Sequence, residues 1–315
     1  MSVLLRRREV IAGLGGAAAW PLAACTDRVR ALQMRVLRLH AEAVADKIGA
    51  NIAAITSQIR STVQLPWSGS TIEQRRLIAQ LLLRQVPAIT ELVQLDSTGK
   101  EQFRVGRLVI QEPDRPPDYI SHDPKVAEAV ARKVSYGPVY FSRESEPYMK
   151  FFLAGTGRDA SVSVAEVNLR FIWDVVSQIK VGQRGQAYVI DAEGRLIAHP
   201  DVSLVLRNTD MTRLPQVNAA RAGGAGSVTD PVPEALDIHG HKVLTAYAPV
   251  APLGWLVFVE LPSDEAYAPL FGAILPSFGL LLAGLTLAFF GTAWFSWRSG
   301  RWASRKMVGP SEVVE

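Results

Sequence analysis

The feature that most constrains this chain is an uncharged apolar stretch near its C-terminus. No charged residue occurs between Glu265 and Arg298, and residues 270–297 read LFGAILPSFGLLLAGLTLAFFGTAWFSW. A helix needs about 20 apolar residues to cross a bilayer, so the stretch predicts a transmembrane helix over residues 268–297. Tryptophans favour the headgroup zone of a membrane, and three of them gather at the basic end of this stretch. The alternative interpretation is a buried core helix.

Basic clusters flank the apolar segments at both ends of the chain. Residues 6–8 are three arginines, and Arg298, Arg301, Arg305 and Lys306 follow the apolar stretch. Because cations resist translocation, both ends are expected in the cytoplasm and the residues between the two segments outside it. The formal net charge is only +4 and much of it lies in these clusters, so a nucleic-acid surface is not expected.

Residues 1–25 are expected to be a signal peptide or a signal anchor. Residues 10–24 form a short apolar run behind the arginines, typical of a secretory segment. Arg6–Ile11 is similar to a twin-arginine signal, and Leu22–Cys25 is similar to a lipoprotein processing site. Cleavage, lipidation at Cys25 and retention as an anchor all stay open. Because Cys25 is the sole cysteine, no disulfide can form within the chain.

Helical periodicity dominates the region that follows. Residues 26–66 are predicted to form one long helix, because Leu37, Val44, Ile48, Ile52, Ile55 and Ile59 recur at spacings of seven, four, four, three and four. A second helix is expected after Ser70, whose hydroxyl would form a capping box with Glu73. The buried face of this second helix is expected to be Leu77, Ile78, Leu81 and Leu82.

A strand, turn and strand pattern occurs twice. Residues 89–95 and 101–105 flank the turn Asp96–Lys100, and residues 187–190 and 196–199 flank the turn Asp191–Arg195. Aspartate and glycine suit a tight hairpin. The offset between the two aspartates, 191 minus 96, is 95 residues. One match of this length suggests an internal repeat without proving it.

Each hairpin is followed by a helical stretch and further strands. The predicted helices are residues 123–134 and 214–221, and glycines near 223–226 predict a turn. The predicted strands are residues 139–154, 242–247 and 255–261. Residues 163–181 are expected to link the halves with a helix. The predicted fold class is α+β, with a long helix packed on two antiparallel-sheet modules, a membrane-distal one over residues 67–165 and a membrane-proximal one over residues 166–267.

Residues 29–267 resemble the double Cache sensors of bacterial histidine kinases, cyclases and chemotaxis receptors. The residues that carry the resemblance are GQRGQAYVIDAEGRLIAHPD at 182–201, GPVYF at 137–141, EPYM at 146–149 and PLGWLV at 252–257. The resemblance implies two PAS-like modules, a ligand pocket in the distal module, and a sensor that passes ligand binding through a transmembrane helix.

The C-terminal residues extend this resemblance and then depart from it. Residues 298–315 are expected to be a cytoplasmic stub, in which Arg305–Pro310 resembles the opening of a HAMP linker while Ser311 departs from the pattern. No kinase, cyclase or methyl-accepting domain follows, so a kinase or cyclase in trans is expected to supply the output. The resemblance also implies a homodimer in the bacterial inner membrane with a periplasmic sensor.

The expected ligand residues of the distal module are Arg104, Tyr119, Tyr140, Tyr148 and Lys150. Such polar and aromatic groups could hold a small carboxylate, in a cavity expected to face the long helix. Each is explained equally well as a surface or core residue. An amino-acid ligand is disfavoured, because the amino-acid-binding branch of the family has a tryptophan among its ligand contacts and this chain has none between Trp67 and Trp173.

No catalytic residue, metal site or cofactor is expected. His199 has no second histidine or cysteine at ligand spacing, and His239 and His241 are more simply explained by a turn. An exported hydrolase would need a nucleophile elbow or a metal cluster. A lipid-anchored solute-binding protein is the main alternative to a receptor, and the apolar stretch at 270–297 argues against it.

Overall fold

The structure is a computed structural model that describes residues 19–63, 71–107, 120, 123–141, 146–155, 161–223 and 235–303. The predictions for residues 1–18, Tyr119 and residues 304–315 therefore lie outside the described residues. The chain divides into two compact units. One is Ala31–Ser263, and the other combines Met1–Arg30 with Asp264–Glu315. The sensor-like features all lie in the first unit.

The long N-terminal helix is confirmed. Helix α2 runs from Ala19 to Val63. All six apolar residues that predicted it are buried. Their spacing places them along one side of the helix, which is the side that an amphipathic helix packs against a core.

The distal sheet has the strand order β2-β1-β6-β5-β3, with β4 also paired to β5, and all of its pairings are antiparallel. Its strands are β1 (Ile89–Leu95), β2 (Glu101–Gly106), β3 (Val134–Tyr136), β4 (Tyr140–Phe141), β5 (Pro147–Ala154) and β6 (Val162–Asn168). Two helices belong with it, α3 (Ile72–Gln85) and α4 (Pro124–Arg132).

The proximal sheet is separate and has the order β8-β7-β10-β9. Its strands are β7 (Gln186–Ile190), β8 (Leu196–Ala198), β9 (Val243–Val250) and β10 (Trp255–Pro262). Helices α5 (Arg170–Gln178), α6 (Val202–Leu206) and α7 (Pro215–Gly223) accompany it. Two antiparallel sheets and a long helix confirm the α+β class.

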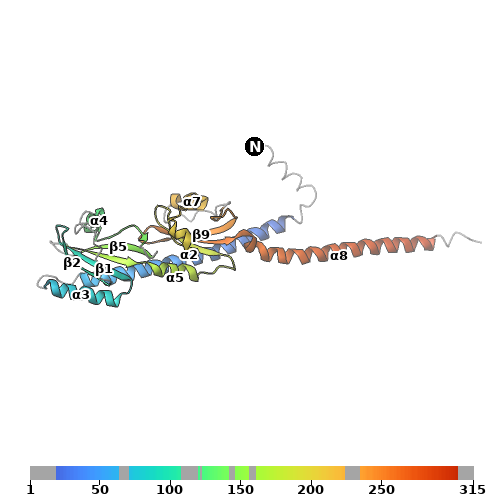
Figure 1. The fold of residues 1–315 in the computed structure, drawn as a ribbon. Coiled ribbons are helices and arrows are strands. Elements are labelled where there is room, and N and C mark those ends of the chain that lie inside the picture. Colours follow the sequence, from blue (N-terminus) through green and yellow to red (C-terminus); the bar gives the residue numbers. More distant parts are fainter. Residues whose placement is uncertain are drawn as a thin grey trace, which may run out of the picture. The chain divides into compact units, whose positions relative to one another are not determined.

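Helix α2 contacts both sheet modules. The Thr56 hydroxyl lies 3.2 Å from the Tyr136 hydroxyl of the distal sheet. Further along, Gly49 comes so near the β9–β10 turn that a Cβ there would lie 3.2 Å from the carbonyl oxygen of Ala251. Figure 1 shows α4 and α7 on the opposite side of the sheets from α2.

The expected linker at residues 163–181 is partly wrong. Residues 162–168 form β6, which pairs with both β1 and β5, and the helix begins only at Arg170. Valine and alanine at 162, 164, 165 and 167 are all buried. A strand covered on both faces has a continuous apolar run, which periodicity does not distinguish from a buried helix.

The capping box of α3 is present one residue later than expected. Thr71, not Ser70, is the N-cap, and its hydroxyl accepts from the Gln74 amide at 3.3 Å while Gln74 accepts from the Thr71 amide at 3.0 Å. The expected buried face is also wrong in part, because Leu77 and Leu81 are exposed. The buried residues of α3 are Ala79, Leu82 and Leu83.

Helix α8 runs from Ser263 to Ala303. Within the described part of the chain, no helix is both long and apolar enough to span a membrane. The side chains of residues 269–278, 281 and 295–303 of this helix lie outside the described ones. The transmembrane helix at 268–297 and the boundaries of the two modules stay predictions.

Candidate functional site: the polar face of the distal sheet

Charged and aromatic side chains gather on one face of the distal sheet. Glu91 lies opposite Glu166, which in turn lies opposite Lys150 on the next strand. Directly opposed residues of an antiparallel pair project to the same face, as do residues two apart along a strand. The register therefore places seven residues together, here called the polar face: Glu91, Glu101, Arg104, Tyr140, Tyr148, Lys150 and Glu166.

The polar face points away from α2. The opposite face of the sheet carries Tyr136 and Phe151, whose rings meet edge to face at 5.1 Å, and Tyr136 contacts Thr56 of α2. The polar face is on the same side of the sheet as α4, whose Ala129 packs with Phe152 of β5. The expectation that the polar residues face the long helix is thus wrong, because α2 covers the apolar face.

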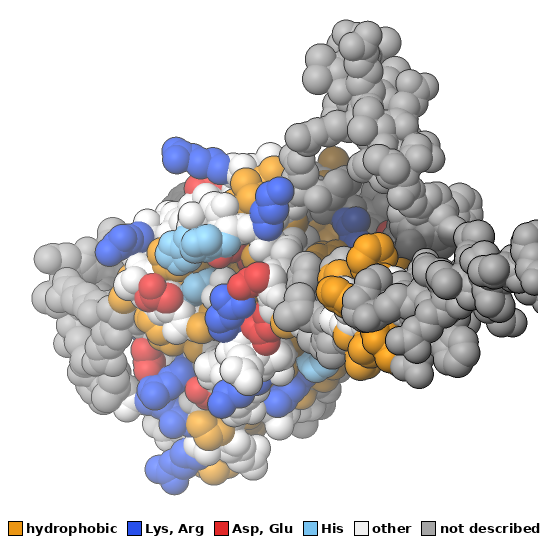
Figure 2. All heavy atoms as spheres, turned by 90° about the vertical axis from the view of Figure 1, so that its right-hand side faces the viewer, with side chains coloured by type: hydrophobic (Ala, Val, Ile, Leu, Met, Phe, Trp, Pro, Cys, Tyr) orange, Lys and Arg blue, Asp and Glu red, His pale blue; other side chains and the backbone are white. Residues whose placement is uncertain are grey.

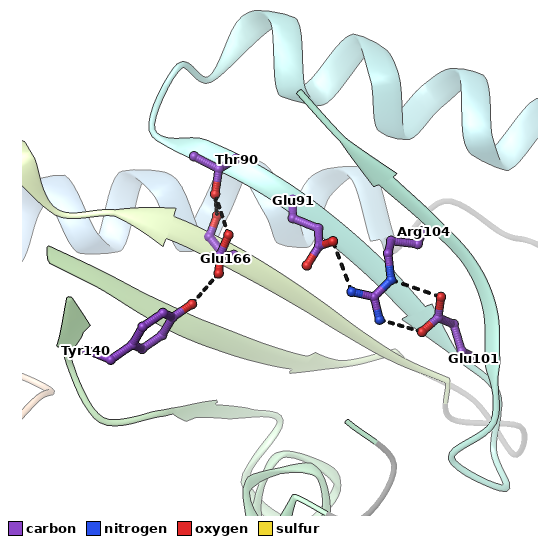
Figure 3. A network of polar contacts seen from close by, with 6 residues as sticks. All are labelled: Thr90, Glu91, Glu101, Arg104, Tyr140 and Glu166. Carbon is purple, nitrogen blue, oxygen red and sulfur yellow. Dashed lines mark hydrogen bonds and ion pairs between the residues drawn. The ribbon is translucent and has the colours of Figure 1, made fainter. Parts of the chain in front are cut away.

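Arg104 is held between two carboxylates (Figure 3). Its guanidinium donates to Glu91 at 3.0 Å and to Glu101 at 3.1 and 2.7 Å. The hydrogen bonds from Arg104 to Glu101, with the charge of Glu91, raise the pKa of Arg104, so it stays charged. A guanidinium engaged in this way has few donors left for an anionic ligand.

Glu166 accepts from two hydroxyl groups (Figure 3). The Thr90 hydroxyl donates to Oε2 at 2.9 Å, and the Tyr140 hydroxyl donates to Oε1. These donors come from β1 and β4, on either side of β6 and β5. Glu166 is therefore oriented from both sides of the polar face.

Tyr140 and Tyr148 form an aromatic pair beside Glu166. Their rings stack with centroids 6.2 Å apart and planes inclined by 26°. Glu146 lies next to them and accepts from Asn168 at 2.5 Å and from Arg170 at 3.0 Å. Burial raises the pKa of the Tyr148 hydroxyl, with Glu146 nearby, so it remains a donor at neutral pH.

The polar face contains four of the five residues expected to bind ligand. Arg104, Tyr140, Tyr148 and Lys150 share it, while Tyr119 lies outside the described residues. The sequence interpretation missed the three glutamates. Glu166 was missed because β6 was taken for part of a linker, and Glu91 and Glu101 because the hairpin was considered only for its turn.

Apart from the polar face, a cavity lies between the two modules. A cavity of about 260 Å³ is lined by both modules, with Tyr136 and Met149 on the distal side and Arg195 and Trp255 on the proximal side. Arg195 already pairs with Asp191 at 2.8 Å. The Asp191 carboxylate also accepts the Glu193 and Arg195 amides of its turn. Two of the charged residues of this cavity, Asp191 and Arg195, thus hold the hairpin turn together.

The proximal sheet has a buried counterpart of Glu166. The 95-residue offset between the hairpins makes Gln186 of β7 equivalent to Glu91 of β1. Glu91 pairs with Glu166 of β6 and Gln186 pairs with Glu260 of β10, so Glu260 occupies the place of Glu166. Glu260 is 2% exposed and accepts from the Tyr188 hydroxyl at 2.7 Å and from Gln216 at 3.1 Å. In both modules a tyrosine therefore donates to the glutamate.

The histidines have structural partners. The ring of His199 accepts from the Asp201 amide at 2.9 Å, and that of His241 lies 3.0 Å from the carboxylate of Asp237. Among the described residues, no group of three or more histidine, cysteine or acidic side chains could hold a metal ion. On the face drawn in Figure 2, described acidic and basic side chains are interspersed with apolar ones rather than gathered by sign.

Part of this chain is similar in sequence to a chemotaxis receptor. A segment of 114 residues is 28% identical to the methyl-accepting chemotaxis protein PscA of Pseudomonas syringae pv. tomato, covering 35% of this chain and 17% of PscA. This chain thus matches about a sixth of the length of that relative.

Two solved structures share the fold at low sequence identity. The extracellular domain of the putative histidine kinase mmHK1S-Z2 has a TM-score of 0.59 at 15% identity, covering 75% of this chain and 99% of that domain. The ligand-binding domain of the chemoreceptor PctB of Pseudomonas aeruginosa, in complex with L-Gln, has a TM-score of 0.52 at 17% identity, covering 78% and 98%.

The family comparison covers most of the chain. The double-Cache model of the Cache domain family matches residues 24–270, which include α2 and both sheets. This chain belongs to the double Cache family of sensor domains.

Proposed function

We propose that this chain is the sensor part of a bacterial membrane receptor, and that the polar face of its distal sheet binds a small organic molecule with an ammonium group. The proposal rests on the double Cache family and on one observation: the arginine of the polar face is already neutralised by two glutamates. A ligand with an ammonium group fits the remaining charge better than a simple carboxylate does.

The charges of the polar face favour a cation. Its members include three carboxylates, Glu91, Glu101 and Glu166, against Arg104 and Lys150. Salt bridges tie Arg104 to the first two carboxylates, whereas Glu166 is oriented by neutral hydroxyls. An ammonium group beside Glu166 would form a charge-assisted hydrogen bond.

The aromatic pair supports the same ligand class. Tyr140 and Tyr148 stack beside Glu166, and a cation over an aromatic face gains about 0.5–2 kcal/mol. The absence of a tryptophan between Trp67 and Trp173 therefore does not exclude a cation–π contact with an amine, because the two tyrosines provide aromatic rings. PctB, which shares the fold, is known in complex with L-Gln, so an amino acid is one member of the proposed class.

Matched ligands test the class. The full chain is screened by thermal shift against the twenty amino acids, and each binder is retested as its decarboxylated amine and as its deaminated acid. A bound ligand stabilises the folded state by mass action. We expect the amine to retain the shift and the acid to lose it. Retention by the acid alone would refute the ammonium class and restore the carboxylate expected from the sequence.

Variants locate the site within the chain. Glu166→Gln is expected to reduce the ligand-induced shift strongly, while Glu193→Gln, a change at an exposed carboxylate of the proximal hairpin, is expected to keep it. The reverse pattern would move the ligand away from the polar face.

Helix α8 is proposed to anchor the sensor in the inner membrane, with residues 30–265 in the periplasm. Large apolar side chains are exposed along it, among them Leu280, Leu285, Leu287 and Phe289. No charge occurs over residues 266–297. Reporter fusions after Gly223 test this topology: an alkaline phosphatase is expected to be active there. Activity of a cytoplasmic reporter at the same position would contradict it.

A homodimer is proposed through α2. Leu32, Val36 and Leu39 are exposed, and the exposed positions Ala43 and Ala50 continue their heptad spacing. In a Cys25→Ser background, Ala50→Cys is expected to form an intermolecular disulfide between parallel helices. Arg38→Cys, an exposed position off this stripe, is the control. Equal cross-linking at both positions would argue for random collision.

A further inference from the structure

The interior of the proximal module holds a polar cluster that ligand binding in the distal module does not use. Glu260 is 2% exposed on β10, and its Oε1 accepts from Tyr188 of β7 and from Gln216 of α7. Thr245 of β9 lies directly opposite it in the sheet. The ion pairs found among the described residues do not include Glu260.

The groups that face Glu260 make its ionised form costly. Burial raises the pKa of Glu260 from its ordinary value of 4.5 to about 7, and the negative charge of Asp237 acts in the same direction. The hydrogen bonds from Tyr188 and Gln216 oppose this rise. His199 lies against Tyr188 with ring centroids 6.2 Å apart, and burial lowers its pKa, so it adds no fixed positive charge at neutral pH.

Two buried atoms beside Glu260 have no hydrogen-bond partner among the residues that the structure describes. They are the side-chain carbonyl oxygen of Gln216, a residue 1% exposed, and the hydroxyl oxygen of Thr245, a residue 8% exposed. An ionised carboxylate only accepts hydrogen bonds, whereas a protonated carboxyl also donates one. A proton on Glu260 could therefore be donated to an acceptor such as the Gln216 carbonyl oxygen, whereas the Thr245 hydroxyl can itself donate or accept.

We propose that the proximal module is a proton-responsive element, in which proton uptake and release at Glu260 alter the packing of β10, the strand that leads into α8. Strand β10 ends at Pro262 and α8 begins at Ser263. Proton release leaves a buried negative charge on Glu260, to which Tyr188 and Gln216 already donate, and this charge favours a rearrangement in which the Thr245 hydroxyl also donates to it. The element works without a ligand on the polar face, so it is independent of the proposed function.

The sign of the pH effect follows from linkage. The folded chain holds the Glu260 proton more tightly than the unfolded chain, so the contribution of Glu260 to stability is greatest below its ordinary pKa and is lost as the pH rises through about 7. Over that window the folding equilibrium constant is expected to fall on the order of a hundredfold.

Infrared spectroscopy and thermal melting of the full chain test the element together. A protonated-carboxyl band is expected to disappear with a midpoint near pH 7, about the pKa of Glu260, and to be absent from Glu260→Gln. The melting temperature of the wild type should fall between about pH 5 and pH 8, with Glu260→Gln markedly flatter. Glu166→Gln, the equivalent change in the distal module, should retain both wild-type responses.

A second variant covers the case in which Glu260→Gln does not fold. Tyr188→Phe removes a donor that favours the ionised carboxylate, so the infrared midpoint should move to higher pH. A wild-type band persisting in Glu260→Gln, or a midpoint unmoved by Tyr188→Phe, would overturn the proposal.

Discussion

The two sheets place a glutamate at the same point and surround it differently. In the distal sheet Glu166 lies among other charges, whereas in the proximal sheet Glu260 is buried. The positions of Glu91, Glu101, Arg104 and Lys150 correspond by register to Gln186, Leu196, His199 and Thr245. One sheet scaffold thus holds its glutamate either on a charged, partly exposed face or in a buried cluster without Arg or Lys, according to four neighbouring side chains.

This comparison separates ligand recognition from stability. The distal carboxylates are partly exposed, so the energy of their contacts can be exchanged for that of contacts with a ligand. The proximal carboxylate is enclosed by Tyr188, Phe258 and Gln216, and changes there act on folding. The same kind of substitution made once in each module distinguishes ligand recognition in the distal sheet from stability in the proximal sheet.

The largest difference is expected at the two tyrosines that donate to the glutamates. Tyr188 is 1% exposed and stacks on Phe258 with centroids 5.2 Å apart, so Tyr188→Ala should lower the free energy of unfolding by about 3–5 kcal/mol. Tyr140→Ala, at a half-buried side chain, should cost about 1 kcal/mol. Chemical denaturation measures both. Equal losses would contradict the distinction between interior and surface.

Ligand affinity should show the opposite asymmetry. Glu166→Gln should weaken binding of the amine found in the screen by about 10- to 100-fold, since a charge-assisted hydrogen bond contributes roughly 1.5–3 kcal/mol. Glu260→Gln should leave that affinity within about twofold. Isothermal titration calorimetry measures both. A comparable loss in the two variants would mean that the modules are coupled in binding.

The two hairpin turns offer a smaller test. Gly99 and Gly194 have φ of +85° and +92°, and alanine in this region costs about 1–2 kcal/mol. A Cβ at Gly194 would also lie 2.5 Å from Cγ2 of Thr212. Gly194→Ala should therefore destabilise the chain more than Gly99→Ala, measured by denaturation. Adding Thr212→Ser should recover part of the loss, and its failure to do so would exclude the clash as the cause.

The smallest effect is expected when the arginine of the polar face is removed. Arg104→Gln leaves Glu91 and Glu101 without their counter-ion, so the affinity for an amine should rise a few-fold at low salt and less at high salt. His199→Gln, the matching proximal change, should have no effect. If Arg104→Gln instead weakens binding, Arg104 contacts the ligand directly and an anionic group belongs in the site.

The elements with strong local signals could be predicted from the sequence. The heptad-like spacing in α2 and the Asp-x-x-Gly turns at Asp96 and Asp191 depend on residues near each other in the chain. Strand β6 could not be distinguished from a helix, because its valines and alanine are buried on both faces and therefore leave no alternation of apolar and polar residues. Whether a segment is covered on one side or two depends on distant partners.

The same limit applied to the candidate site. Four of its residues were identified because they are polar or aromatic in the expected module, but the pairing of Arg104 with Glu91 joins residues 13 apart across a hairpin. The sequence interpretation expected a small carboxylate, with a cation such as Arg104 or Lys150 as its partner. The register places Glu91 and Glu101 beside Arg104, and for this reason the proposed ligand carries an ammonium group instead.

Helix α2 has a mechanical consequence for a sensor of this kind. It touches the distal sheet at Thr56 and the proximal turn at Gly49, seven residues or about two helical turns apart. An unbroken helix is stiff over such a short distance, so a tilt imposed at Thr56 is not absorbed before Gly49. A Cβ at Gly49 would lie 3.2 Å from the Ala251 carbonyl oxygen, so a larger residue there would push the helix and the turn apart. We expect a movement of α2 at Thr56 to reach the turn between the last two strands through this close contact.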